Sequence, residues 1–523
     1  MAPRKRARSV DIDFTLRRVF GKKSFRPVQR EVITAALEGH DVFLQAATSF
    51  GKSLCFQLPA IVDFGITIVI SPLLALMNNQ IAALRVASVR VATINSTTKR
   101  PERDAVMEDL KSGHPLTRLL YVTPEYCQMD HFRKVLRVVY AQRELARIAV
   151  DEAHCISEWG HDFRPAFQGL SWFKEELPNV PIICCTATAT QRVREDIIKT
   201  LSLDPQKLKL FTMTTSRPNL HYEVRFKSDE ADHYDDFLAW IRKAHQRRSE
   251  GPRAEELAAK GERITNVPGI IYTLYRKDCE ILASRLTQDG IGAKPYHAGL
   301  TNEQKDENLK NWVSNTPGYD VIVATTAFGM GIDKDNVRFV VHWQIPKSFE
   351  GYYQEAGRAG RDGKASVCII YYSREDRDRA ANMMAREHER KASSNQNQRY
   401  QSGGGAGGQT KRDTNMMSRA SSLQSLIEYC ESTNQCRHRM IASYFGQRNL
   451  QQQRQGGRSI AATRSSDKIE TDEMEKIECD FACDWHKDAF ALVRRKDQGL
   501  ASEEWCSTQR ESGAYGEYYD EYD

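Results

Sequence analysis

The stretch "DVFLQAATSFGKSLCFQLPAIV", residues 41–62, decides the fold of the first part of the chain. Its beginning, "DVFLQAA", predicts a buried β-strand, and "SLCFQLPAIV" predicts a helix. Between them, Gly51-Lys52-Ser53 is typical of the end of a loop that wraps around nucleotide phosphates. Backbone N–H groups of such a loop, and the N-terminus of the helix after it, attract phosphate oxygens. We therefore predict a nucleotide site in which Lys52 reaches the β- and γ-phosphates and Ser53 binds Mg²⁺.

The same strand–loop pattern recurs along residues 14–213, in "GITIVISP", "RLLYVTPE", "RIAVDEAH" and "PIICCTAT". These short runs are apolar on both faces, which is typical of a parallel sheet covered by helices on both sides. The pattern repeats over residues 214–389, in "GIIYTLY", "KPYHAGL", "YDVIVATTAFGMG", "RFVVHWQIP" and "ASVCIIYYS". The sequence therefore predicts two tandem three-layer α/β domains, with binding loops at the carboxyl ends of the strands.

The remaining segments differ in composition. Residues 1–13 contain the basic run "MAPRKRARS", which indicates a nuclear localisation signal, an arm that contacts DNA, or only a solvated tail. The charged stretch 245–266 predicts an exposed insertion, and the Gly-, Gln- and Ser-rich stretch 390–415 predicts a flexible linker. Helical pattern resumes over 416–490, and we expect residues 491–523 to form a disordered acidic tail.

The length, composition and net charge of the chain exclude several classes of protein. At 523 residues, 40% hydrophobic and 28% charged, the chain is too long for one core and has an ordinary globular composition. A net charge of +6 permits nucleic-acid binding without demanding it. We find neither an apolar run of the roughly 18 residues that a membrane span needs nor a secretory signal. Most of the twelve cysteines are scattered, many within apolar runs, which is typical of a reducing compartment.

Two further groups complete the predicted nucleotide site. Asp151 and Glu152 follow the strand of "RIAVDEAH", where the Asp would hold Mg²⁺ and the Glu would orient the attacking water. Two acids at a strand end are common by themselves, but a Gly-Lys-Ser about a hundred residues earlier favours the catalytic interpretation. In "YYQEAGRAGRDG", Arg358 and Arg361 would reach across a cleft to the transferring phosphoryl group. The alternative is that they are surface arginines on a polar loop.

A late group of Cys436, Cys479, Cys483 and His486 predicts a metal site. A C-x3-C-x2-H group with one distant cysteine suits a tetrahedral Cys3His zinc site of structural type. Cys430 is an alternative first ligand, and unrelated reduced cysteines are the alternative to the whole site.

Together these motifs resemble the RecQ family of DNA helicases, in helicase superfamily two, over about residues 14–490. The motifs "FGKKSFRPVQREVI", "SPLLALMNNQ", "YVTPE", "DEAHCISEWGHDFRPAF", "TATAT", "HAGL", "ATTAFGMGIDKDNVRFVVHWQIPKS" and "YYQEAGRAGRDG" occur in the family's order. The resemblance implies two RecA-like domains followed by a small helical zinc-binding subdomain. It also implies a nuclear ATP-dependent helicase or translocase that moves 3′ to 5′ in DNA repair or recombination. The implied cofactors are ATP, Mg²⁺ and Zn²⁺, and the implied partner is single-stranded DNA or a 3′-tailed or forked duplex.

The resemblance also assigns residues. The implied nucleotide-binding residues are Arg26, Gln29 (on the base edge), Thr48, Ser49, Gly51, Lys52, Ser53, Gly329, Asp333 and Gln354. The implied DNA-binding residues are Ser71, Asn79, Thr123, Trp159, His161, Phe163, Arg164 and Thr325. In the family, the aromatic-rich loop around Trp159 couples DNA binding to ATP hydrolysis, and flat side chains in it can stack on bases. The "R-H-R…YFG" that follows Cys436 aligns with the family's ligand-bearing helix and favours Cys436 over Cys430.

This sequence departs from the family pattern at several positions. Ser49-Phe50 stands where the family usually has Gly-Gly, which puts the hydrolysis rate in doubt more than nucleotide binding. Glu158 stands where a Gln is common, and His486 replaces a cysteine. Only 37 residues follow His486, too few for the family's winged helix, so we expect a short form, a fragment or a truncated product. Two rival functions stay open: a degenerate RecQ-like DNA-binding protein with little unwinding activity, and an RNA helicase of the same superfamily.

Overall fold

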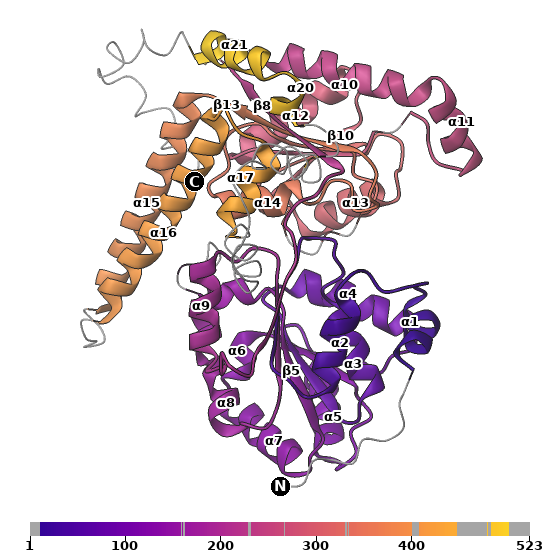
Figure 1. The fold of residues 1–523 in the computed structure, drawn as a ribbon, viewed down its shortest axis with the longest axis vertical. Helices are drawn as coiled ribbons and strands as arrows, with labels where there is room; N and C mark the ends of the chain where they lie inside the picture. Colours follow the sequence, from indigo (N-terminus) through magenta and orange to yellow (C-terminus); the bar gives the residue numbers. More distant parts are fainter. Residues whose placement is uncertain are drawn as a thin grey trace, which may run out of the picture.

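The computed structural model describes residues 11–500 except 158, 160–162, 228–231, 266, 330–331, 333, 400–406, 447–478 and 480–482. For residues 253, 387–399 and 407–415 only the backbone is described. The two predicted sheets are present, each at the centre of its own lobe (Figure 1), which confirms the predicted fold class. None of the described helices is both long and apolar enough to span a lipid bilayer.

The first lobe contains a seven-stranded parallel sheet in the order β3-β4-β2-β5-β6-β1-β7. Its elements are α1 (Ile12–Phe20), α2 (Gln29–Leu37), β1 (Val42–Gln45), α3 (Leu54–Val62), β2 (Ile66–Ile70), α4 (Leu74–Val86), β3 (Val91–Ile94), α5 (Arg100–Lys111), β4 (Leu119–Val122), α6 (Pro124–Cys127), α7 (Asp130–Ala141), β5 (Leu145–Val150), η1 (Ala153–Ile156), η2 (Pro165–Ser171), α8 (Trp172–Glu176), β6 (Ile182–Thr186), α9 (Gln191–Thr200) and β7 (Lys209–Thr212).

The second lobe contains a six-stranded parallel sheet in the order β10-β11-β9-β12-β13-β8. Its elements are β8 (Leu220–Phe226), α10 (Tyr234–Ser249), α11 (Pro252–Ala259), β9 (Gly269–Tyr272), α12 (Arg276–Gln288), β10 (Ala293–Tyr296), α13 (Asn302–Val313), β11 (Val321–Ala324), β12 (Phe339–His342), α14 (Phe349–Ala356) and β13 (Ser366–Tyr372). A helical region follows with α15 (Arg374–Arg399), α16 (Gly407–Glu431), α17 (Arg437–Tyr444), α20 (Asp484–Lys487) and α21 (Ala489–Leu500).

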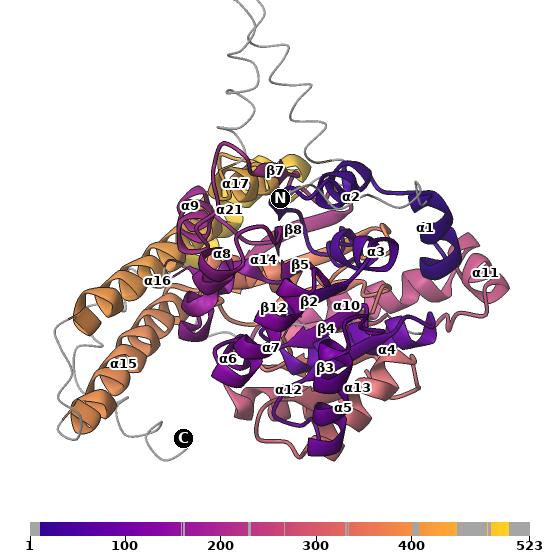
Figure 2. The same cartoon turned by 90° about the horizontal axis from the view of Figure 1, so that it is seen from below.

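Alternation along the central strands explains why both sheets are buried. In β2, Ile66, Ile68 and Ile70 belong to the core on one face of the sheet, while Val69 belongs to the core on the other face. Successive side chains of a strand point to opposite faces, so a continuous apolar run supplies two cores at once. In the first lobe, α7 and α9 pack against one face of the sheet and α2, α3 and α4 pack against the other, as Figure 2 shows from below.

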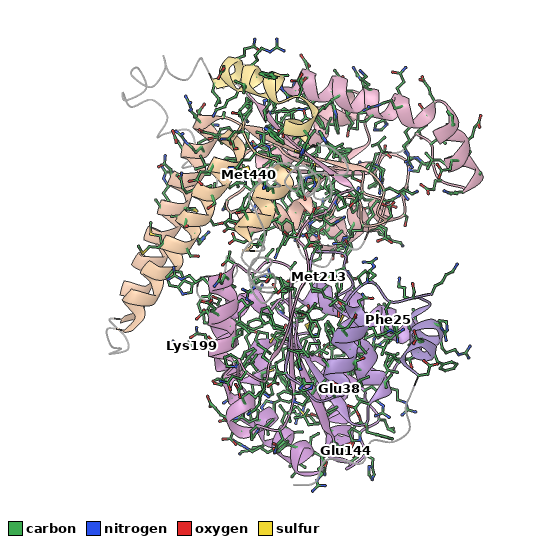
Figure 3. The ribbon with its side chains drawn as sticks, viewed as in Figure 1. Phe25, Glu38, Glu144, Lys199, Met213 and Met440 are labelled. Carbon is green, nitrogen blue, oxygen red and sulfur yellow. The ribbon has the colours of Figure 1, made fainter. Side chains whose placement is uncertain are left out.

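The carboxyl ends of the parallel strands lie at one edge of each sheet, which gathers the loops that follow them. In the first lobe this edge brings together the loops after β1, β2, β4, β5 and β6. Figure 3 marks Met213, one residue beyond β7, at the junction between the lobes, where the chain passes from one to the other.

The structure differs from the sequence predictions at four places. Helices α10 and α11 occupy much of the predicted insertion 245–266, and Leu257 within it is fully buried. Helices α15 and α16 extend into 390–415, because Lys, Arg, Gln and Ala in this stretch are good helix formers. Helix α21 occupies the first residues of the predicted tail 491–523, held by buried Leu492 and Leu500. Strands β3, β7 and β8 were not among the predicted strands.

Candidate nucleotide and DNA site

The loop between β1 and α3 contains two residues with a left-handed backbone. Ser49 and Gly51 both have positive φ, at 72° and 86°. Gly51 has no Cβ, so this conformation costs it little, whereas Ser49 is strained there. Phe50 between them is partly buried against the core above β1. The structure therefore accommodates Ser49-Phe50, at the cost of one strained residue in the loop.

Side chains from two directions hold this loop. The ammonium of Lys52 donates hydrogen bonds to the carbonyls of Ala46 and Ala47, at 3.1 and 3.3 Å, so it lies inside the loop. The amide of Gln29 donates to the Phe50 carbonyl at 2.9 Å, and Arg26 contacts the Ser49 carbonyl. Arg26 and Gln29, predicted to bind the nucleotide, thus also brace the loop.

Asp151 lies at the end of β5, almost fully buried, and is connected to a polar network. Gln80 of α4 donates from Nε2 to Asp151 Oδ2 at 3.1 Å, and the Glu152 amide donates to Asp151 Oδ1 at 3.1 Å. The Oε1 atom of Gln80 accepts from the Tyr121 hydroxyl and from Gln57, which fixes the orientation of its amide. Burial raises the pKa of Asp151, while Gln80 and then Lys52 oppose that rise.

The oxygens of this carboxylate retain capacity for a metal ion. Each oxygen accepts one hydrogen bond, from Gln80 or from the Glu152 amide, whereas a carboxylate offers about four lone-pair sites in total. Carboxylate and hydroxyl oxygens are the ligands that Mg²⁺ prefers. The donor set of Asp151 and Ser53 therefore fits Mg²⁺ chemically.

Glu152 begins a chain of polar contacts that ends in the second lobe. Its backbone is left-handed, with φ at 50°, and its carboxylate lies 3.4 Å from Nδ1 of buried His154. His154 contacts the Thr186 hydroxyl at 3.1 Å, and that hydroxyl accepts from the Thr188 amide. Gln354 of α14 in turn donates to the Thr188 hydroxyl at 3.0 Å. The predicted catalytic acid and the predicted nucleotide-binding Gln354 are thereby connected across the two lobes.

The loop that carries Arg358 and Arg361 lies against the phosphate loop. A side-chain carbon added at Gly357 would lie 3.3 Å from Cβ and Oγ1 of Thr48. The Arg358 side chain is 5% exposed and lies beside the Tyr272 hydroxyl of its own lobe. Burial raises the pKa of Tyr272, and the nearby Arg358 opposes that rise. The structure thus brings the backbone of the arginine loop to the nucleotide site, with the Arg358 guanidinium directed toward Tyr272.

The predicted DNA-side residues fall into two groups. Ser71 and Thr123 follow β2 and β4 at the same edge of the first sheet, and Thr123 caps α6 by accepting from the Tyr126 amide. Asn79 is exposed on α4, and Thr325 follows β11 in the second lobe. Arg164 donates to the Pro72 carbonyl at 2.8 Å, which joins the aromatic loop to the segment after Ser71.

The Trp159 side chain is half-buried and is not fully exposed to solvent. Its ring packs against the core of the first lobe, and the guanidinium of Arg192 lies over its face. Its carbonyl accepts a 2.7 Å hydrogen bond from Ser418 of α16. Phe163 is partly exposed. The predicted His161 and Asp333, and the departure at Glu158, lie outside the described residues, and Gly329 lies in the loop after β11.

The late cysteines gather in one cluster. Ligand atoms of Cys436, His438, Cys479 and Cys483 all lie within 4.8 Å of one another. Cys483 Sγ is 3.9 Å from Cys436 Sγ and 3.4 Å from Nδ1 of His486. Bonds of about 2.3 Å to sulfur and 2.0 Å to nitrogen around a tetrahedral zinc put S–S and S–N pairs roughly 3.8 and 3.5 Å apart. Cys436, Cys479 and Cys483 of the predicted set therefore fit a zinc site. The ligand atom of His438 lies close to all three, whereas the predicted His486 contacts Cys483 at 3.4 Å. Cys430 is buried in the second-lobe core instead.

Sequence reasoning missed Gln80, Arg217 and His438. Gln80 stood within the quoted "SPLLALMNNQ", but its contact with Asp151 depends on how α4 packs across the sheet. Arg217 donates to four carbonyls, one in the first lobe and three in the second, which no spacing rule predicts. His438 is two residues from Cys436, and that spacing was the available signal.

A phosphate loop, an acid pair at a strand end and a second parallel-sheet lobe with its arginine loop against the first define the class of two-lobed helicase-type motor proteins. Comparison with known families gives the same class. The chain matches DEAD/DEAH box helicase over residues 26–197, the helicase conserved C-terminal domain over 254–363 and the RecQ zinc-binding domain over 374–487.

The chain belongs to the RecQ helicase family. It is 41% identical over 436 residues to ATP-dependent DNA helicase Q5 of Rattus norvegicus, which covers 83% of this chain and 42% of that protein. It is 37% identical to RecQ-like DNA helicase BLM of Xenopus laevis, covering 82% of this chain and 28% of that protein. It is 36% identical to ATP-dependent helicase SGS1 of Saccharomyces cerevisiae, covering 84% of this chain and 27% of that protein. The chain thus spans less than half the length of each of these three relatives.

Solved structures support the fold. The DUF1998 helicase MrfA bound to DNA matches with a TM-score of 0.54 at 17% identity, over 71% of this chain and 52% of that chain. The DEAD-box helicase Mss116 bound to ssRNA and UDP-BeF matches with a TM-score of 0.52 at 16% identity, over 80% of this chain and 93% of that chain. At these identities the likeness supports the two-lobed fold alone.

Proposed function

We propose that this protein is an ATP-dependent DNA helicase or translocase that moves 3′ to 5′ on single-stranded DNA and separates duplexes in DNA repair or recombination. The observation that carries the proposal is the approach of Gly357 to Thr48. It sets the arginine loop of one lobe beside the phosphate loop of the other, the geometry in which nucleotide binding and release alter the junction between lobes.

Each site residue has a role in this proposal. Lys52 binds the β- and γ-phosphates, and Glu152 orients the attacking water, held on its other side by His154. Arg358 and Arg361 stabilise charge on the transferring phosphoryl group. Bound through Ser53 and Asp151, Mg²⁺ would neutralise phosphate charge. The aromatic loop begins directly after the acid pair, so a strand held at Trp159, Phe163 and Arg164 acts on Glu152 through a short stretch of chain.

A strand-displacement assay tests the proposal. The wild-type protein should unwind a 3′-tailed duplex in the presence of ATP and Mg²⁺, and should leave a 5′-tailed duplex intact. Lys52→Ala should abolish both unwinding and DNA-stimulated ATP hydrolysis, since the loop would lose its phosphate-binding ammonium. Equal ATPase rates in wild type and Lys52→Ala would rule out the motor function. Stronger stimulation by single-stranded RNA than by DNA would favour the RNA helicase.

One observation favours a second function, a DNA-binding protein that turns over ATP too slowly to unwind. Ser49 holds a left-handed backbone conformation that glycine adopts more easily, so loop plasticity is reduced. Nucleotide and DNA binding of normal strength, with ATPase activity independent of DNA, would support this alternative.

We also propose a nuclear location, supported by the basic run Arg4-Lys5-Arg6 in residues 1–13. Replacing the three residues by alanine in a fluorescent fusion should move the protein out of the nucleus. An unchanged distribution would contradict this role of the run.

A further inference from the structure

Arg217 lies at the crossing between the two lobes, in the segment that joins β7 to β8. Its side chain is buried, and its guanidinium makes contacts in two directions. One nitrogen donates to the Thr48 carbonyl of the phosphate loop at 3.4 Å and to the Gly357 carbonyl at 3.2 Å. The other donates to the carbonyls of Ala359 and Gly360 at 2.8 and 2.9 Å. One side chain therefore contacts the backbone on both sides of Arg358 and the phosphate loop as well.

The neighbouring residues strengthen this arrangement. Asn219 donates to the carbonyls of Gly360 and Lys364, at 2.9 and 3.0 Å. Gly360 has a φ of 55°, and a side-chain carbon there would lie 2.5 Å from Nδ2 of Asn219, so only glycine fits. The Tyr353 hydroxyl donates to the Thr215 carbonyl at 2.9 Å. The joining segment thus fixes the loop from Gly357 to Gly360 by several independent hydrogen bonds.

The Arg217 backbone is itself held from a third direction. Its carbonyl accepts from the Leu220 amide at 2.9 Å and contacts Nε2 of His438 at 3.2 Å. His438 is the second imidazole of the cysteine cluster. The position of Arg217 is therefore set jointly by its contacts at the lobe junction and by His438 of the cysteine cluster.

We infer that Arg217 is a positioning residue that sets the arginine loop against the phosphate loop, so that Arg358 reaches the reacting phosphate once its side chain turns from Tyr272 toward bound nucleotide. A rigid fork suits this task because a guanidinium presents several N–H groups in one plane, whereas a lysine ammonium presents a point charge. The inference rests on the proposed ATPase function. Arg217 is assigned no contact with the nucleotide.

Four variants test the inference in DNA-stimulated ATP hydrolysis: Arg217→Ala, Arg217→Lys, Arg358→Ala and the double variant Arg217→Ala with Arg358→Ala. Misplacing a catalytic group by about 1 Å lowers turnover roughly a hundredfold, so we expect Arg217→Ala to lower kcat roughly tenfold to a hundredfold. The KM for ATP and the affinity for a fluorescent ATP analogue should stay within about twofold, because ground-state binding is not its role. Arg217→Lys should recover part of kcat only, and serves as the test if Arg217→Ala fails to fold.

The double variant gives the decisive readout. If Arg217 acts through Arg358, its loss should lower kcat no further in the Arg358→Ala background. Arg133→Ala is the matched control, since Arg133 also donates to two backbone carbonyls, of Cys127 and Gly169, away from the site. It should leave kcat unchanged.

Failure of the inference is distinguishable from failure of the proposed function. A wild-type protein without ATPase activity refutes the function itself. With an active wild type, the inference is overturned if Arg217→Ala keeps full kcat, if its effect multiplies with that of Arg358→Ala, if nucleotide affinity falls in parallel with kcat, or if Arg358→Ala is fully active.

Discussion

Arg437 and Asp484 form a fork-to-fork ion pair with both side chains buried, at 2.9 Å from Nε to Oδ1 and 3.1 Å from the second guanidinium nitrogen to Oδ2. Burial lowers the pKa of Arg437, but Asp484 overcomes that effect and the net shift is upward. Asp484 also accepts from the Val224 amide of β8 at 3.0 Å. One pair therefore fastens α17 and α20 to the edge of the second sheet.

Asp484→Ala should be strongly destabilising, by about 3–5 kcal/mol, because it leaves a buried guanidinium without its counter-charge. Thermal unfolding of the zinc-loaded protein measures the loss. Replacing both residues, with Arg437→Met and Asp484→Leu, should cost less than the single change. Glu176→Ala is the control, since its pair with Arg137 is exposed, and it should cost no more than about 1 kcal/mol. A double variant less stable than Asp484→Ala would contradict the argument.

Ser49→Gly should stabilise the protein by about 1 kcal/mol, because glycine adopts a positive φ without the steric cost that serine bears. It should also raise kcat, since the loop regains plasticity. Ser202→Gly is the matched control, with a φ of 53° at the end of α9, away from the nucleotide site. It should raise the melting temperature similarly and leave kcat unchanged. An unaltered kcat in Ser49→Gly would remove the observation that favours the second function, a DNA-binding protein that turns over ATP too slowly to unwind.

Gln80→Met should weaken the binding of a divalent cation about 10- to 100-fold, the usual effect of removing a partner that orients a metal ligand. The thioether cannot donate to Asp151, while the side chain keeps its length. The measurements are the Mg²⁺ concentration for half-maximal ATPase activity and nucleotide-dependent Mn²⁺ binding by electron paramagnetic resonance. Gln142→Met, on the exposed end of α7, is the control. Unchanged Mn²⁺ affinity in Gln80→Met would show that Asp151 is held well enough without it.

Zinc content should distinguish the two histidines of the cysteine cluster. We expect about one equivalent in the wild-type protein, in line with a Cys3His site, and less than a tenth in Cys483→Ser. His486→Ala should bind zinc more weakly, because its Nδ1 lies 3.4 Å from Cys483 Sγ, the spacing of two ligands on one ion. His438→Ala should retain the metal, because the three cysteines and His486 supply four ligands without it, although His438 also lies within the cluster. The reverse pattern would assign the fourth ligand to His438.

The fold was largely predictable from the sequence, because central strands such as Ile66–Ile70 are apolar on both faces and each ends in a recognisable loop. Edge strand β7 was missed because Lys209 and Leu210 are exposed, so it lacks the apolar signal of a buried strand. The nucleotide loop and the acid pair were predicted from local spacing. Arg217 and Gln80 were not, since the Arg217 contact with Thr48 spans 169 residues and forms only where the lobes meet, and the Gln80 contact with Asp151 forms only when α4 packs on the first sheet.

The bond from the Ser418 hydroxyl to the Trp159 carbonyl spans 259 residues of sequence. A ribosome that adds about 5–20 residues per second needs roughly ten to fifty seconds to make that interval. During this time the nascent first lobe holds the start of its aromatic loop without the support that α16 later supplies. The order of synthesis therefore leaves the Trp159 carbonyl without this partner until α16 has been made.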